Sequence, residues 1–476
     1  MNLRNSIYCI LTALLSTACS GYHKPDRPMS GYPDIFPDYT GVTVAPNLAP
    51  LNFRIDMPAE AYQTAIGAFG AEPEIVLNGN PADIPVDKWH KLLAEHRGDS
   101  IAVEVSLRIG GEWVAYEPFP VYVSRDSIDG WLAYRMLYPG YELWSEMGIY
   151  QRDLSNFDQT AILENKDVEK MCLNCHSFSA GDPNTMMLHV RGKKGGTVIV
   201  SQGSAKKVNP VSKDEFPNGA AYPAWSPRGR FIAFASNQIQ QFFHRSGPKT
   251  TEVVDLSADL LVYDSNTGKA YSDSAVSVKE YFETFPVWNP AGDMIYFCRA
   301  EKTTGLPLDS VRYNLCRVPF DTTTCTFGAV ERLYDAAADN HSCSFPRVSP
   351  DGRWLMFTRS GYGNFSIWHT ESQLCVMDLR DLSIRELEEV NAPDAVDSYH
   401  SWSGNSRWFV FSSKRIDGLW AQPFIAHFDP ATGKAGKPVL LPQRDPEYYK
   451  ECLMTFNIPE LIKEPVTQDF VPVIMN

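Results

Sequence analysis

The C-terminal two-thirds of the chain repeats one pattern four times, and this self-similarity limits the possible folds more than any other feature. Each copy opens with an aromatic residue, passes through a Pro- or Gly-containing turn and continues into an apolar strand. The copies begin at Tyr222, Phe285, Phe345 and Tyr399. They lie about 60 residues apart, a length that suits four-stranded blades with inserts between strands. A mainly β protein containing a β-propeller is therefore predicted.

The third copy carries the most specific motif, Val348-Ser349-Pro350-Asp351-Gly352, whereas the fourth has Gly404 and Ser406 in place of the Pro and Gly. This pattern resembles the PD40, or WD40-like, repeats of TolB-type propellers, and it covers residues 184–450. Further strand material around residues 196–200 and in the C-terminal tail leads us to expect five or six blades.

Composition narrows the possible partners. Hydrophobic residues make up 44% of the chain and aromatic residues 12%, so a predominantly disordered chain is excluded. The 43 Lys and Arg against 57 Asp and Glu leave a net charge of -14, which repels nucleic-acid phosphates and anionic lipid headgroups. We expect no nucleic-acid partner.

The N-terminus reads as an export signal. Arg4 precedes an apolar run over residues 7–15, and small residues lead up to Cys19. The pattern resembles a bacterial lipoprotein signal, which implies lipidation of Cys19, although Ser16 stands where that family prefers Leu. An ordinary secretory signal is the alternative. Residues 1–19 are then the signal peptide, and the Pro-rich residues 20–50 form a tether.

This reading sets an expected location. No later apolar run reaches the length of a membrane span, so the membrane is contacted only through the lipid anchor. No acidic run follows Cys19. We therefore predict a periplasm-facing lipoprotein of the outer membrane with protein partners in the cell envelope.

Residues 172–176 contain the motif C-x-x-C-H, which is the signature of c-type haem attachment. On a helical turn, Cys172 and Cys175 would reach the two vinyl groups of one porphyrin while His176 binds the iron as the proximal ligand. The polar residues 161–170 before the motif read as a helix. The motif thus predicts one covalent haem c on a short helical segment in the linker 126–183. A redox-active dithiol and a zinc site are the alternatives.

The second axial ligand of such a haem is left open among three residues. Met186, Met187 and His189 follow the motif closely enough for the chain to fold back over the other haem face. Met would raise the reduction potential relative to a second His. Core packing is the alternative role for the two Met side chains.

The remaining segments complete the expected organisation. Short β runs over residues 51–125 predict a β-sandwich-like domain, and residues 451–476 are expected as a tail packing on the propeller. Six further cysteines could form disulfides that the sequence does not pair, with Cys298–Cys316 as the first guess, and free buried thiols are the alternative. These are Cys298, Cys316, Cys325, Cys343, Cys375 and Cys452.

The combined arrangement resembles exported lipoproteins of the Bacteroides type in which C-x-x-C-H precedes a TolB-like propeller. Residues 141–144 and 147–152 are part of this likeness. We therefore predict an electron-transfer or other haem-based redox protein. The alternative is a protein-interaction scaffold in which the motif is structural or a dithiol. Nucleophile-elbow and metalloprotease motifs are missing from the sequence, so no catalytic residue is assigned, and an enzyme would be an oxidoreductase.

Overall fold

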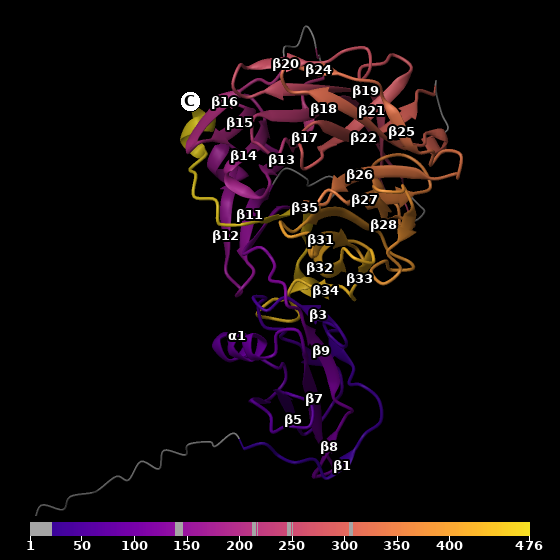
Figure 1. Cartoon of the computed structure of the whole chain (residues 1–476). Coiled ribbons are helices and arrows are strands. Elements are labelled where there is room, and N and C mark those ends of the chain that lie inside the picture. The colour runs from indigo at the N-terminus through magenta and orange to yellow at the C-terminus, as the bar shows by residue number, and fades with distance from the viewer. Residues whose placement is uncertain are drawn as a thin grey trace, which may run out of the picture.

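The computed structural model describes residues 21–138, 146–211, 216, 218–244, 249, 251–303 and 308–476. Most of this chain lies in antiparallel sheets, and the few helices are short (Figure 1). None of the described helices is long and apolar enough to cross a membrane. The predicted signal peptide, including Cys19, and the run 141–144 lie outside the described residues.

The N-terminal domain is built around one seven-stranded sheet, not the predicted β-sandwich (Figure 1). Its strand order is β1-β8-β7-β5-β6, and β9 joins β7 to β3. A two-stranded sheet and one helix complete the domain. Helix α1 spans Val86–Glu95 and buries Trp89, Leu92 and Leu93, which the i, i+3, i+4 spacing places on one face. The strands are β1 Arg27–Pro28, β2 Ile35–Phe36, β3 Thr43–Val44, β4 Arg54–Ile55, β5 Ala61–Gly67, β6 Ile75–Asn78, β7 Ser100–Ile109, β8 Glu112–Ala115 and β9 Phe119–Val123.

The prediction of a tether over residues 20–50 is wrong for the part of this segment that the structure describes. From residue 21 onward this segment contributes β1, β2 and β3 to the domain, and its apolar side chains enter the core. Tyr39 is 1% exposed, and Val42 and Val44 are fully buried. Because these side chains occur singly among prolines, their sequence shows no periodicity, and their burial comes from packing against distant parts of the chain.

Between residues 131 and 462 the described chain forms six antiparallel sheets of four or five strands. The strands are β10 Trp131–Leu137, β11 Met147–Asp153, β12 Gln159–Glu164, β13 Cys172–Ser179, β14 Asp182–Arg191, β15 Gly196–Ser201, β16 Ser204–Val208, β17 Ala221–Trp225, β18 Phe231–Phe243, β19 Thr251–Asp264, β20 Lys269–Tyr271, β21 Tyr281–Trp288, β22 Met294–Glu301, β23 Asn314–Asp321, β24 Thr326–Phe327, β25 Glu331–Tyr334, β26 Ser342–Val348, β27 Trp354–Ser360, β28 Gln373–Asp378, β29 Ile384–Glu386, β30 Asp397–Trp402, β31 Trp408–Ser413, β32 Gln422–Asp429, β33 Lys434–Ala435, β34 Val439–Leu440 and β35 Thr455–Ile462. Two short helices, α2 Tyr448–Glu451 and α3 Val471–Met475, flank β35.

The six sheets close into a ring. One inner strand from each sheet contacts its neighbour in the order β35, β13, β17, β21, β26, β30, and β30 returns to β35. This arrangement confirms the predicted β-propeller. The ring begins at β10 instead of residue 184, because β10, β11 and β12 pair with the C-terminal strand β35 to make one sheet. The tail over residues 451–476, which was expected to pack on the propeller and to help complete a further blade, supplies the inner strand that closes the ring.

The segment around the C-x-x-C-H motif was predicted to be helical, but the motif itself lies in a strand. β12 ends at Glu164, a 3-10 turn covers Asn165–Val168, and the motif itself starts β13. Glu169 and Lys170 both adopt positive φ, 53° and 55°, and two consecutive left-handed residues end a right-handed helix. β13 then pairs along β14.

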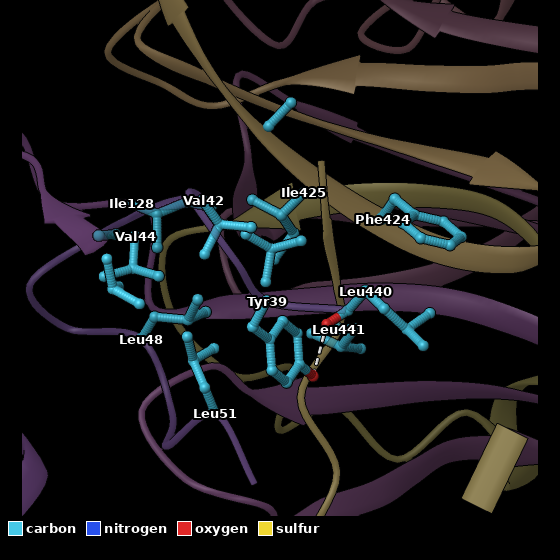
Figure 2. Packing of buried hydrophobic residues seen from close by; sticks show 14 of the residues in the cluster. Tyr39, Val42, Val44, Leu48, Leu51, Ile128, Phe424, Ile425, Leu440 and Leu441 are labelled. Carbon is cyan, nitrogen blue, oxygen red and sulfur yellow. Dashed lines mark hydrogen bonds between the residues drawn. The ribbon is translucent and has the colours of Figure 1, made fainter. Parts of the chain in front are cut away.

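The two domains share one hydrophobic core. Tyr39, Val42 and Leu48 of the N-terminal domain pack against Ile425 and Leu440 of the last sheet (Figure 2). The Tyr39 hydroxyl donates a hydrogen bond to the Leu440 carbonyl at 3.2 Å. The N-terminal domain is thus fixed to the propeller and does not hang from it on a linker.

All eight cysteines in the described chain are free thiols. The guessed Cys298–Cys316 bridge is not formed, because Cys298 lies opposite Leu315 and Cys316 lies opposite Phe297 in the β22–β23 ladder. One residue of offset turns the two side chains to opposite faces of the sheet. Burial raises the pKa of Cys316 to about 12, so this thiol is inert at neutral pH.

Candidate functional site

Each inner strand brings one four-residue segment, here called the axial segment, to the centre of the ring. Five of these segments begin with a residue of positive φ: Tyr222 (49°), Phe285 (54°), Phe345 (52°), Tyr399 (50°) and Ile458 (47°). Bulky residues rarely adopt this conformation, so it persists only where surrounding packing imposes it. The fifth segment, in β35, is a repeat that the sequence analysis did not detect.

The sixth axial segment is Cys175-His176-Ser177-Phe178 in β13. Cys175 and His176 line a small axial cavity together with the first and second residues of the segments at Tyr222 and Phe285. Arg347 and Glu460 line this cavity as well. Ser177 and Phe178 line the neighbouring cavity beside the third and fourth residues of the other segments. The last two residues of the C-x-x-C-H motif therefore occupy the aromatic and proline positions of the propeller repeat.

The surroundings of the motif do not fit a haem in this structure. Cys172 packs in the hydrophobic cluster between the first two sheets, whereas Cys175 faces the axis. The cavity at Cys175 and His176 measures about 20 Å³, room for a single water. The His176 side chain is 1% exposed. Burial, helped by the positive charge of Arg135, lowers its pKa to about 3.

The three residues expected as distal ligands have other partners. Met186 packs between the first and second sheets, and Met187 packs between the second and third. His189 pairs through Nδ1 with the Thr197 hydroxyl at 3.0 Å. The described residues contain no group of three His, Cys, Asp or Glu that could hold a metal ion. Covalent haem and its distal ligand stay predictions of the sequence motif.

The neighbouring cavity, which Ser177 and Phe178 line, is the larger of the two and measures about 400 Å³. It lies on the axis, above the first residues of the axial segments, and we call it the axial funnel. This volume is within the usual range of small-molecule sites. Its floor is the third residue of each axial segment, namely Glu460, Ser177, Ala224, Val287, Arg347 and Ser401. Its wall is the fourth residue of each, namely Leu461, Phe178, Trp225, Trp288, Val348 and Trp402.

Two of the wall indoles are held by the neighbouring blade. Trp288 Nε1 donates to the Ala224 carbonyl at 3.1 Å, and Trp402 Nε1 donates to the Arg347 carbonyl at 3.0 Å. Trp225 is 6% exposed, and its Nε1 has no hydrogen-bond partner among the described residues. The rigid indoles fix the shape of the wall, while Trp225 keeps an unused donor in it.

The funnel floor carries two charged groups. Glu460 Oε2 accepts a hydrogen bond from the Phe178 amide at 3.3 Å, and Oε1 lies 3.9 Å from His176 Nε2. Burial raises the pKa of Glu460 to about 7, although the nearby Arg347 guanidinium opposes this shift. Arg347 Nη1 donates to the Pro346 carbonyl at 3.1 Å. Burial lowers the pKa of Arg347.

Sequence reasoning missed both charged residues. The repeat was defined by its aromatic, Pro and Trp positions, and the third position varies from copy to copy. Aligning Ile458-Pro459-Glu460-Leu461 with Phe345-Pro346-Arg347-Val348 would have placed both charges at that variable position.

A second polar cluster lies where the long β18–β19 hairpin meets the loop after β27. His369 Nε2 is 3.2 Å from Glu252 Oε2, and His369 Nδ1 is 3.4 Å from Glu371 Oε1. Lys249 Nζ also lies 2.8 Å from Glu371 Oε1. Burial alone would lower the pKa of His369, but its bonds to Glu252 and Glu371 outweigh burial and raise it. This ion-pair cluster ties two blades together.

Comparisons with known proteins leave the activity open. No protein-family model matches the chain, and no curated protein matches it in sequence. Among solved structures, the chain is similar to a TolB-type protein of Agrobacterium tumefaciens with 14% identity and a TM-score of 0.38, covering 67% of this chain and 92% of that one. It is also similar to oligogalacturonate lyase from Vibrio parahaemolyticus with 12% identity and a TM-score of 0.37, covering 61% and 70%. Prolyl oligopeptidase B from Galerina marginata matches with 11% identity and a TM-score of 0.36, covering 64% and 44%.

Proposed function

We propose that this protein is a binding protein that captures a ligand in the axial funnel of its propeller. The observation that carries the proposal is the composition of the funnel. A mostly apolar and aromatic wall encloses a floor where a few polar groups converge, and this combination is typical of ligand sites. In this proposal the chain is exported to the cell envelope, as its N-terminal sequence predicts, and meets its ligand there.

The redox function predicted from the C-x-x-C-H motif is the second candidate, and the motif alone favours it. The axial positions of Cys175 and His176 favour the binding protein instead, since both residues serve the packing of the ring. We propose that the motif is structural in this chain.

A plugged funnel tests the proposed function. Val287 lines the floor, so Val287→Trp fills the cavity with a large side chain. The matched control is Leu453→Trp, because Leu453 is 57% exposed and does not line the funnel. Wild type and both variants are screened against one immobilised array of short peptides, glycans and amino acids.

The expected result is at least one ligand whose affinity falls more than about tenfold in Val287→Trp and is unchanged in Leu453→Trp. Circular dichroism and the melting temperature confirm that both variants are folded. An array on which every ligand binds wild type and the plugged variant equally refutes the proposal.

A further inference from the structure

The funnel floor is divided into a polar half and an apolar half. The order of inner strands around the ring places Arg347 of β26, Ser401 of β30, Glu460 of β35 and Ser177 of β13 one after another. Ala224 of β17 and Val287 of β21 fill the opposite side. A ligand on this floor therefore meets charges on one side and aliphatic carbon on the other.

The two charges on the polar half lie near each other but form no direct ion pair. Arg347 and Glu460 are on either side of the Ser401 strand, and the ion pairs of the described chain include none between them. Each charge favours the ionised form of the other, which lowers the pKa of Glu460 and raises that of Arg347, but burial opposes and exceeds both effects. The Glu460 side chain is only 17% exposed. Removing charges from water is costly unless each finds a partner, so an acid and a base that share one cavity without a direct ion pair can each accept an opposite charge from a ligand.

We propose that the axial funnel binds a small zwitterion, either a free amino acid or a short peptide with an apolar side chain. This inference rests on the proposed function and names the chemistry of its ligand. The ligand's ammonium group lies against Glu460, and its carboxylate lies against the Arg347 guanidinium, which can grip a carboxylate with two parallel hydrogen bonds. Its side chain lies over Val287 and the wall indoles.

A ligand with a single charge fits this floor less well. An anion would pair with Arg347 but leave the Glu460 carboxylate repelling it across the floor. A cation would pair with Glu460 and lie near the aromatic wall, but it would face the Arg347 guanidinium. A molecule that carries both charges satisfies both residues. Asp129 and Lys463 also line the funnel, but the Asp129 carboxylate already accepts hydrogen bonds from Ser403 and Gly404. The volume of about 400 Å³ admits a molecule of this size.

The test compares three probes that share one benzyl group: L-phenylalanine, 2-phenylethylamine and N-acetyl-L-phenylalanine. 2-Phenylethylamine lacks the carboxylate but keeps its ammonium charge at pH 8, and the acetyl group removes the ammonium charge but leaves the carboxylate. Isothermal titration calorimetry on the exported chain at pH 8, above the pKa of about 7 for Glu460, measures each affinity. We expect L-phenylalanine to bind on the order of 10- to 100-fold more tightly than either analogue.

Two conservative variants assign each charge to its partner. Glu460→Gln keeps an acceptor for the Phe178 amide and should abolish the preference for L-phenylalanine over its N-acetyl form. Arg347→Gln should abolish the preference over 2-phenylethylamine. The controls Glu331→Gln and Arg332→Gln make the same charge changes on the exposed strand β25 and should leave all three affinities unchanged.

Equal affinities for the three probes, or preferences that survive both variants, overturn the zwitterion proposal. If no probe binds but the array yields a funnel-dependent ligand of another chemistry, the zwitterion proposal fails and the binding function stands. If neither experiment yields a funnel-dependent ligand, both fail.

Discussion

The shared core of the two domains predicts that they unfold together, and Tyr39 is the residue that tests this best. Its ring is 1% exposed between the N-terminal domain and the last sheet, and its hydroxyl bonds the Leu440 carbonyl (Figure 2). Removing a buried aromatic side chain costs about 3–5 kcal/mol, and losing the hydrogen bond adds about 1 kcal/mol. Tyr39→Ala should therefore lower the free energy of unfolding by about 4–6 kcal/mol, and Tyr39→Phe by about 1 kcal/mol.

Urea unfolding followed by circular dichroism and by tryptophan fluorescence measures both effects. The wild-type chain should show coincident transitions by the two probes, because tryptophans lie in both domains. Tyr122→Ala is the matched control: this tyrosine is in β9 of the same domain but 48% exposed, so the change should stay within about 1 kcal/mol. Separate transitions, with only one of them shifted by Tyr39→Ala, would refute the single shared core.

Three further predictions concern the ring. The raised pKa of His369 means that the protonated imidazole stabilises the fold fully below its unfolded pKa of about 6.5, and that this stability is lost as the pH rises through the folded pKa. Wild type should therefore lose its stability advantage over His369→Gln as the pH rises above about 6.5 in urea titrations, and a constant difference would contradict the ion-pair geometry. Truncation after Met454 removes β35 and leaves the inner edge of β10 unpaired, so the truncated chain should show no cooperative melting transition in calorimetry. The control, which lacks only residues 472–476, should keep a cooperative transition. The chain, produced together with a c-type haem maturation system, should give no pyridine haemochrome signal, because Cys172 and Cys175 face different spaces. One haem per chain would overturn the placement of β13 on the axis.

The propeller could be predicted from the sequence because its signal is local and repeated. Aromatic and Pro residues ahead of a turn and an apolar strand recur in each blade, so four imperfect copies were enough. Strand material at residues 196–200 and in the C-terminal tail predicted one or two further blades, but the axial segments at Cys175 and Ile458 were not recognised because they lack the aromatic start. The ring geometry shows that these residues occupy the same position as the aromatic residues of the other four segments.

The haem motif shows how one short pattern can have two physical origins. C-x-x-C-H was interpreted as a helical turn, yet Cys175-His176-Ser177-Phe178 also matches Tyr399-His400-Ser401-Trp402 at its second and third positions. Burial lowers the pKa of both His176 and His400 to about 3, so each is a neutral ring packed in the wall of the axis. The repeat alignment, applied to this segment, would have predicted a strand.

The first and the third residues of the axial segments have different roles: the first residues pack the centre of the ring, and the third residues face the funnel. The first residues are large and apolar in five of the six segments and close the axis below the funnel, a role that any propeller of this kind needs. At the third position four residues are small or aliphatic, which is enough to floor the cavity, and the other two are Arg347 and Glu460. Arg347 and Glu460 each favour the ionised form of the other, but they form no direct ion pair, so the loss of hydration that each suffers in the cavity is only partly offset. The zwitterion that we propose for the funnel would supply the closer partner that each charge lacks.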